Sequence, residues 1–298
     1  MTKMFITDLD GTLFNDEKRI NPLDLQSLKR LGDMGIIRVF ATGRSLYSFQ
    51  QAVEKNGFYN FCEDMPVDYL ICSTGACIIK CNADNGSNNC KIIKKHSLTS
   101  EDVSRIATYF DTLKLDYMIH RPVPDSHYCL YKQQSQSLSL DFKLRIEIYK
   151  DFIKPINYLG AVRDFGESTE VLTIVPYEDG HKTADMIELA LSEFSVVRAT
   201  SPLNEQFLWI EIFNKSVSKS QAVSWLAKEL DVKQQEVVAV GNDYNDLDML
   251  KWAGHSFVVR NAPQMLKDKF TSRDKLMEVA SNNDCGVSEA INSLGIKI

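Results

Sequence analysis

Residues 4–13 read MFITDLDGTL, and this stretch decides how the rest of the chain is interpreted. Its first residues are apolar, as in a short buried strand, and two carboxylates one residue apart follow directly. Side chains at positions i and i+2 of an extended chain project to the same side, so Asp8 and Asp10 can serve one reaction centre. Gly11 then lets the chain turn sharply. A strand end followed by an Asx-type turn is the simpler alternative.

Strand and helix patterns alternate in both halves of the chain. Short apolar runs indicate strands at 36–41, 69–72, 237–240 and 256–259. Helical spacing of apolar residues indicates helices at 22–34, at 222–230, at 246–253 and from 263 onward, and a further helix is expected between Arg44 and about Lys55. Continuous apolar strands separated by helices are typical of a parallel sheet that is covered on both faces. The pattern therefore predicts an α/β protein with a Rossmann-like, doubly wound core.

A segment of different character interrupts this alternation. Residues 81–89 form a polar stretch that suggests a hairpin turn, and a short strand is expected at 91–94. Residues 99–102 then resemble a helix capping box, and mixed strand and helix patterns continue to Phe213. We expect residues 82–213 to form an inserted α+β domain, and residues 1–81 and 214–298 to form the core.

Composition and charge argue against several kinds of partner. The 298 residues carry a net charge of −6 without a long basic run, so neither nucleic acid nor an anionic membrane surface is expected as a partner. No apolar run reaches the roughly 18 residues of a membrane span, and no signal-peptide pattern is present. We expect a cytoplasmic protein, and the sequence does not indicate its oligomeric state.

The seven cysteines show no paired spacing. We expect reduced structural thiols. A zinc site that includes the closely spaced Cys72, Cys77 and Cys81 is the alternative.

Polar residues stand just past the ends of four predicted strands. Asp8 and Asp10 follow the first, and the others are followed by Thr42, by Thr74, and by Asn242 with Asp243. Because the carboxyl ends of strands in an open parallel sheet share one edge, these residues should converge on one site.

The residue types at this edge suit phosphoryl transfer. A carboxylate can attack phosphorus, so Asp8 can form an aspartyl-phosphate while Asp10 acts as general acid and base. Oxygen ligands from Asp8 and from Asn242 or Asp243 suit Mg²⁺. Backbone amides after Asp8 can hold phosphate oxygens. A turn with a helix cap is the alternative at 241–246.

Two further residues would complete a phosphate site. Thr42 offers a hydroxyl and a backbone N–H, although a helix N-cap is the alternative for a lone Thr-Gly-Arg. Lys219 would place a positive charge on the phosphoryl oxygens, and a solvated lysine in a first helical turn is its alternative.

Together these residues resemble the haloacid dehalogenase superfamily, specifically its Cof-like sugar-phosphatase branch with a large inserted cap. The resemblance spans the chain and rests on six matches: residues 8–13, residues 41–44, Lys219, residues 241–246, and the closing segments 261–263 and 282–287. It implies that Asp8 is the nucleophile, and that Asp10 is the general acid and base with its carbonyl oxygen on Mg²⁺. Asn242 or Asp243 would complete the metal site, and Asp246 would support these residues without binding the metal directly. The phosphate would be held by Leu9, Gly11, Thr42, Gly43, Lys219 and Asn245.

The chain departs from the family pattern at three positions. Asn242 stands where the family has aspartate, Thr74 replaces the asparagine of an Asn-Gly pair, and Ser220 replaces a glycine. An uncharged amide at position 242 predicts weaker metal binding.

The expected function is therefore a Mg²⁺-dependent phosphatase acting on a small phosphorylated metabolite, with sugar phosphates as the first candidates. A phosphomutase or phosphotransferase on the same core is one alternative, and a catalytically weak relative that binds phosphorylated metabolites is another. A receiver-type phospho-acceptor would lack both Asp10 and the insertion. Candidate cap contacts to the substrate are His120, Arg121, His127, Tyr128, Tyr177, Asp179 and His181.

Overall fold

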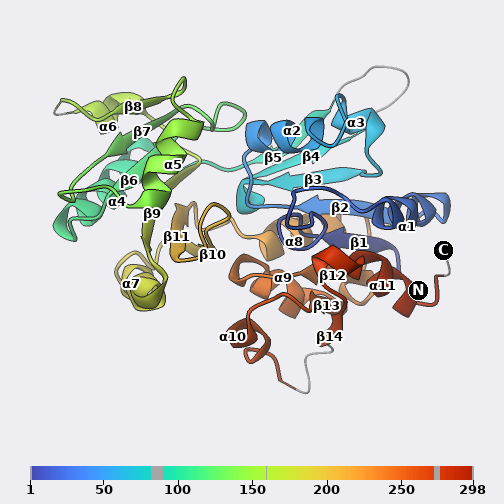
Figure 1. Cartoon of the computed structure of the whole chain (residues 1–298). Helices are drawn as coiled ribbons and strands as arrows, with labels where there is room; N and C mark the ends of the chain where they lie inside the picture. Colours follow the sequence, from blue (N-terminus) through green and yellow to red (C-terminus); the bar gives the residue numbers. More distant parts are fainter. Residues whose placement is uncertain (1, 82–89, 159, 272–275, 297–298) are drawn as a thin grey trace. The chain divides into compact units, whose positions relative to one another are not determined.

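The computed structural model describes residues 2–81, 90–158, 160–271 and 276–296 (Figure 1). The chain divides into two compact units. The first unit comprises residues 1–44, 49–94 and 218–298, and the second comprises 45–48 and 95–217. In Figure 1 the first unit runs from blue to cyan and from orange to red, and the second is mainly green and yellow. Within the described residues, no helix is both long and apolar enough to cross a bilayer.

The first unit is built on an eight-stranded sheet in the order β14-β13-β12-β1-β2-β3-β4-β5. Neighbours from β14 to β3 are parallel, and β4 runs antiparallel to β3. The predicted α/β class with a parallel core is thereby confirmed. The strands are β1 (Met4–Thr7), β2 (Ile37–Ala41), β3 (Tyr69–Cys72), β4 (Cys77–Lys80), β5 (Lys91–Lys95), β12 (Val237–Gly241), β13 (His255–Val259) and β14 (Leu276–Val279).

Helices of this unit begin where the sequence supplies a cap. Asn21 accepts a hydrogen bond from the Leu23 backbone N–H at 3.0 Å, and Pro22 occupies the first helical turn. Ser218 caps α8 in the same way. The α-helices are α1 (Pro22–Asp33), α2 (Leu46–Glu54, which begins in the second unit), α3 (Phe61–Asp64), α8 (Lys219–Glu229), α9 (Leu247–Trp252), α10 (Gln264–Lys267) and α11 (Gly286–Ser293). Short 3-10 turns are η1 (Ser73–Gly75), η2 (Gln234–Glu236), η3 (Tyr244–Asp246) and η4 (Asn282–Asp284).

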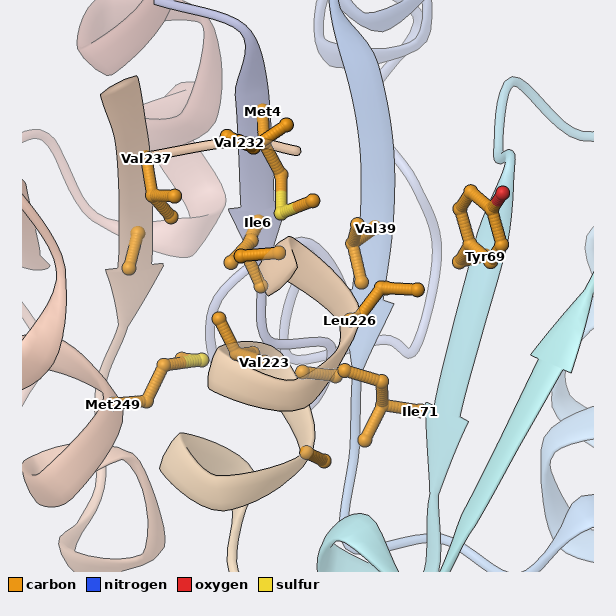
Figure 2. Close-up of a cluster of buried hydrophobic side chains, with 14 of the residues drawn as sticks. Met4, Ile6, Val39, Tyr69, Ile71, Val223, Leu226, Val232, Val237 and Met249 are labelled. Carbon is orange, nitrogen blue, oxygen red and sulfur yellow. The ribbon is translucent and has the colours of Figure 1, made fainter. Parts of the chain in front are cut away.

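Helix α8 is held on the sheet by an apolar cluster, drawn in Figure 2. Val223 and Leu226 of the helix belong to the same buried cluster as Ile6, Val39 and Ile71 from three neighbouring strands. Burying one such aliphatic side chain contributes about 1.5–3 kcal/mol. This packing fixes the position of the first residue of α8 relative to the strands.

The second unit contains a six-stranded sheet in the order β10-β11-β9-β6-β7-β8. All pairs are antiparallel except β7 with β8. The strands are β6 (Tyr117–His120), β7 (Cys129–Lys132), β8 (Ile153–Pro155), β9 (Glu170–Pro176), β10 (Ser195–Thr200) and β11 (Phe207–Phe213), and the helices are α4 (Ser100–Thr112), α5 (Leu140–Ile148), α6 (Ala161–Phe165) and α7 (Tyr177–Ala190). Thr99 and Asp102 form the capping box that the sequence predicts for α4.

The two faces of this sheet carry different helices. Val171 of β9 shares one apolar cluster with residues of α4 and α7, whereas Leu172 shares another with Phe142 of α5. Since side chains of successive strand residues point to opposite faces, α5 lies across the sheet from α4 and α7.

The unit boundaries differ from the predicted 82–213 segment. Strand β5 lies beside β4 in the first sheet, so residues 91–94 belong to the first unit. The second unit extends to residue 217 and also takes in residues 45–48. The prediction was wrong at these ends because strand pairing, which is non-local, decides where β5 belongs. The turn predicted at 82–89 lies outside the described residues.

Candidate active site

Four neighbouring strands bring the predicted polar residues to one edge of the first sheet. Asp8 follows β1, Thr42 follows β2, Thr74 follows β3 and Asn242 follows β12. Strands β12, β1, β2 and β3 are adjacent and parallel, so their carboxyl ends lie together. The edge is tied by backbone bonds, such as that from Thr74 N–H to the Thr42 carbonyl oxygen at 3.0 Å.

Lys219 is the buried cation of this edge. It is fully inaccessible, and its Nζ lies 2.6 Å from Asp8 Oδ1 and 2.6 Å from Asp246 Oδ1. Burial alone would lower the pKa of Lys219, but the two carboxylates raise it above its ordinary value. The alternative of a solvated lysine is therefore wrong, because α8 packs the side chain into the protein.

Asp246 organises the fourth-motif loop around this cation. Its second oxygen, Oδ2, accepts hydrogen bonds from the backbone N–H groups of Asn242 at 2.9 Å and Asp243 at 3.1 Å. The Asp243 side chain in turn caps the short turn η3. Asp246 therefore positions Lys219 and the loop at the same time.

The surroundings of Asp8 disfavour its ionised form. Burial raises the pKa of Asp8 to about 7, and the nearby Asp246 charge adds to this, although Lys219 acts in the opposite direction. A cation beside its other oxygen would favour the ionised form, which is the form that can attack phosphorus.

The Asn242 amide faces three oxygens of the first motif. One of its terminal atoms lies 3.0 Å from the Asp10 carbonyl oxygen, 3.1 Å from Thr12 Oγ1 and 3.2 Å from Asp8 Oδ2. With NH₂ in that place, the amide donates to all three. With oxygen there, the Thr12 hydroxyl donates to it, and the oxygens of Asn242, Asp10 and Asp8 are three acceptors that a cation between them would stabilise. Adjacent ligands of an octahedral Mg²⁺ stand about 3.0 Å apart, given Mg–O distances of about 2.1 Å. The residues present therefore fit Mg²⁺, with the Asn242 amide facing the other two donors.

Gly11 is needed for this close approach. Its φ is +75°, in the left-handed region, and a Cβ there would collide with the Asn242 amide. The loop is braced from behind by a closing segment, because Asn261 donates to the Gly11 carbonyl oxygen at 2.8 Å. Asn282 likewise donates to the Phe14 carbonyl oxygen at 3.1 Å.

Asp10 is held by two cations that the sequence analysis did not single out. Arg44 binds it with both arms of its guanidinium, with Nε at 2.6 Å from Oδ2 and Nη2 at 2.7 Å from Oδ1, and Lys18 Nζ lies 3.3 Å from Oδ1. Burial raises the pKa of Asp10, but Arg44 and then Lys18 more than offset this and leave it below its usual value. The signal for Arg44 was its place two residues after Thr42.

The remaining predicted phosphate ligands lie around Thr42. Its Oγ1 accepts from the Arg44 backbone N–H at 3.0 Å, so it acts as a local cap as well. A Cβ on Gly43 would lie 3.4 Å from the Asn245 amide nitrogen and 3.6 Å from Thr74 Oγ1. These residues therefore line one small area. Leu9 is buried with its carbonyl oxygen accepting from the loop that follows.

Among the candidate cap contacts, His120 is buried within the second unit. It is 2% exposed, with Nδ1 at 2.8 Å from the Ser126 carbonyl oxygen and Nε2 at 3.2 Å from Arg145. Burial, followed by the Arg145 charge, lowers the pKa of His120 to about 3. It is a neutral core histidine.

Comparison with known proteins identifies the family of the chain. The family of haloacid dehalogenase-like hydrolases matches residues 5–291. The 5-amino-6-(5-phospho-D-ribitylamino)uracil phosphatase YwtE of Bacillus subtilis (strain 168) is 26% identical over 309 residues, which cover 98% of each chain. Among solved structures, the subclass IIB sugar phosphatase BT4131 is similar, with a TM-score of 0.72, 17% identity and coverage of 99% of this chain and 100% of that one. BT1666 of Bacteroides thetaiotaomicron has a TM-score of 0.75, 19% identity and coverage of 100% and 96%. The chain therefore belongs to the haloacid dehalogenase-like hydrolase family.

Proposed function

We propose that this hydrolase is a Mg²⁺-dependent phosphatase that releases phosphate from a small phosphorylated metabolite, with sugar phosphates as the first candidates, through an aspartyl-phosphate on Asp8. The observation that carries the proposal is the arrangement around Asp8. One carboxylate oxygen is paired with a fully buried lysine, and the other, like the Asp10 carbonyl oxygen, faces the Asn242 amide.

The chain's own residues can carry both half-reactions. Asp8 would attack phosphorus as the bond to the leaving oxygen breaks, and Asp10 would give that oxygen a proton. Asp10 would then take a proton from the water that hydrolyses the phosphoenzyme, which frees phosphate and restores Asp8. Lys219 would stabilise charge on the phosphoryl oxygens throughout. A bound Mg²⁺ would offset the repulsion between the two anions.

In this scheme Arg44 keeps Asp10 ionised until substrate binds. Paired with the guanidinium, Asp10 is ionised and cannot protonate a leaving group. A phosphate dianion beside it would compete for Arg44 and favour protonation of Asp10. Substrate binding would thus prepare the acid that the first step needs.

The similar proteins support a small phosphorylated substrate. One is named for a phosphorylated ribityl compound and another for sugar phosphates. The uncharged Asn242 favours one alternative, a relative that binds phosphate esters but turns them over weakly. A phosphomutase or phosphotransferase would use the same core and must protect its phosphoenzyme from water.

Phosphate release from a panel of sugar phosphates and other small phosphate esters, with Mg²⁺ and with EDTA, tests the proposal. Wild type should release phosphate only with Mg²⁺, and Asp8→Asn should release none. Asp33→Asn, which changes an exposed acid at the end of α1, is the matched control and should act like wild type. A phosphoryl group trapped on Asp8 would identify the intermediate. Isomerised or transferred phosphate would instead indicate a mutase or transferase, and binding without release at high Mg²⁺ would indicate the weak relative.

A further inference from the structure

Three cysteines gather in the first unit away from the catalytic edge. Cys62 lies in α3, Cys81 directly follows β4, and Cys90 directly precedes β5. Their three Sγ atoms all lie within 4.8 Å of one another. Cys62 and Cys90 are joined in a disulfide, and Cys81 is a free thiol. The expectation of reduced thiols throughout is therefore wrong for two of the seven cysteines.

The sequence could not indicate this grouping. Cys81 and Cys90 stand at the adjoining ends of β4 and β5, which are neighbours in the sheet, and Cys62 of α3 is 28 positions from Cys90. The trio considered from spacing alone, Cys72 with Cys77 and Cys81, does not form. Cys72 and Cys77 instead face each other across the β3–β4 pair.

Three sulfurs at this separation suit a thiophilic divalent cation. Thiolates are preferred ligands of Zn²⁺, and Zn–S distances of about 2.3 Å in a tetrahedron place neighbouring sulfurs about 3.8 Å apart. Cys62 is 1% exposed and Cys81 is 3% exposed, so two of the ligands are already fixed by packing. Small side-chain movements would bring all three sulfurs onto one ion once the disulfide is open.

An entry path lies beside the third sulfur. Cys90 is partly exposed and lines a surface cavity of about 200 Å³, together with Glu54, Tyr59 and Asn60. A reductant or a hydrated ion can reach the cluster from this side. The same opening leaves room for water in the fourth position of a tetrahedral site.

We propose that Cys62, Cys81 and Cys90 form a binding site for one Zn²⁺-like cation, which is available only when the Cys62–Cys90 disulfide is reduced. An external dithiol would supply the two electrons and two protons that open the S–S bond, and would itself become a disulfide. Metal binding would then form three S–metal bonds and release three protons. Disulfide and metal exclude each other, because they use the same two sulfurs.

Co²⁺ added to the full chain is a direct probe, because thiolate-to-cobalt charge transfer absorbs in the near ultraviolet and carboxylate ligands give no such band. Protein reduced with a dithiol and then freed of it should bind one equivalent of Co²⁺ with this band, and Zn²⁺ should abolish it. Disulfide-bonded protein should show no band. Because the readout requires sulfur ligands, it is independent of phosphatase activity and of the oxygen-rich catalytic edge.

Matched variants decide whether these three residues are the ligands. Cys81→Ser should lose the band and still form the Cys62–Cys90 disulfide, whereas Cys285→Ser, which removes a free thiol outside the cluster, should keep one equivalent. Cys90→Ala removes a partly exposed member and serves as a second test if Cys81→Ser does not fold. No band in reduced wild type, or an unchanged band in either cluster variant, would overturn the proposal and leave the disulfide as a structural cross-link only.

Discussion

Replacing Lys219 by methionine should destabilise the first unit strongly. The substitution keeps most of the side-chain volume and removes the charge that lies 2.6 Å from both Asp8 and Asp246. Deleting one partner of a buried ion pair costs about 3–5 kcal/mol, because the remaining charge is left buried without compensation. That is a large part of the roughly 5–15 kcal/mol by which domains are stable.

The measurement is urea unfolding in EDTA, so that no metal can replace the lost charge. A loss of about 3–5 kcal/mol should lower the urea midpoint by roughly 1–2 M. Lys3→Met is the control, since Lys3 is half exposed and pairs with Glu236 at 3.1 Å on the surface, where a pair contributes at most about 1 kcal/mol.

A double variant separates charge from packing. In Lys219→Met, Asp8 and Asp246 are two buried carboxylates without their lysine partner. Adding Asp246→Asn removes one of these two charges and should restore part of the stability. Asp8 can then become protonated, since burial has already raised its pKa to about 7. If Lys219→Met costs no more than Lys3→Met, or if the second substitution makes unfolding easier still, the buried-cation reasoning is refuted.

Three further results follow from the same kind of argument. Asn242→Asp adds a charged oxygen beside the other two donors and should increase the affinity for Mg²⁺ about tenfold or more. The readout is a lower Mg²⁺ concentration for half-maximal phosphate release. An unchanged Mg²⁺ concentration would place the metal elsewhere. Burial raises the pKa of Glu170 to about 7, although the charge of Arg145 acts in the opposite direction. The folded state therefore keeps a proton on Glu170 at pH values where the unfolded state has lost it. The stability that this group contributes is fully present below pH 4.5 and is lost as the pH rises through 7. Glu170→Gln should remove this decline, by up to about 3 kcal/mol between pH 5 and pH 8 in urea unfolding, and an unaltered pH slope would contradict it. Cys62→Ser should cost oxidised protein up to about 3–4 kcal/mol through the lost cross-link to Cys90 and should cost little under reducing conditions, which unfolding with and without reductant compares.

Much of the fold was predictable because its signals are local. Apolar runs mark β1, β2, β3 and β12 without reference to distant residues, and the Asn21 and Thr99 caps set where two helices begin. Strands β4 and β14 were not predicted. Strand β5 was predicted but assigned to the wrong unit, because its pairing depends on a neighbour that local pattern does not identify.

The sequence by itself determined that Asp8 and Asp10 directly follow a buried strand, because an apolar run and the carboxylates after it are local features that need no tertiary information. It also determined the family, through motifs at matching positions. Only the tertiary structure decided that Lys219 is buried between Asp8 and Asp246, that Arg44 forms a salt bridge with Asp10, and that Cys62 is joined to Cys90. These contacts join residues from 27 to 211 positions apart, and they exist because sheet pairing and helix packing bring the segments together.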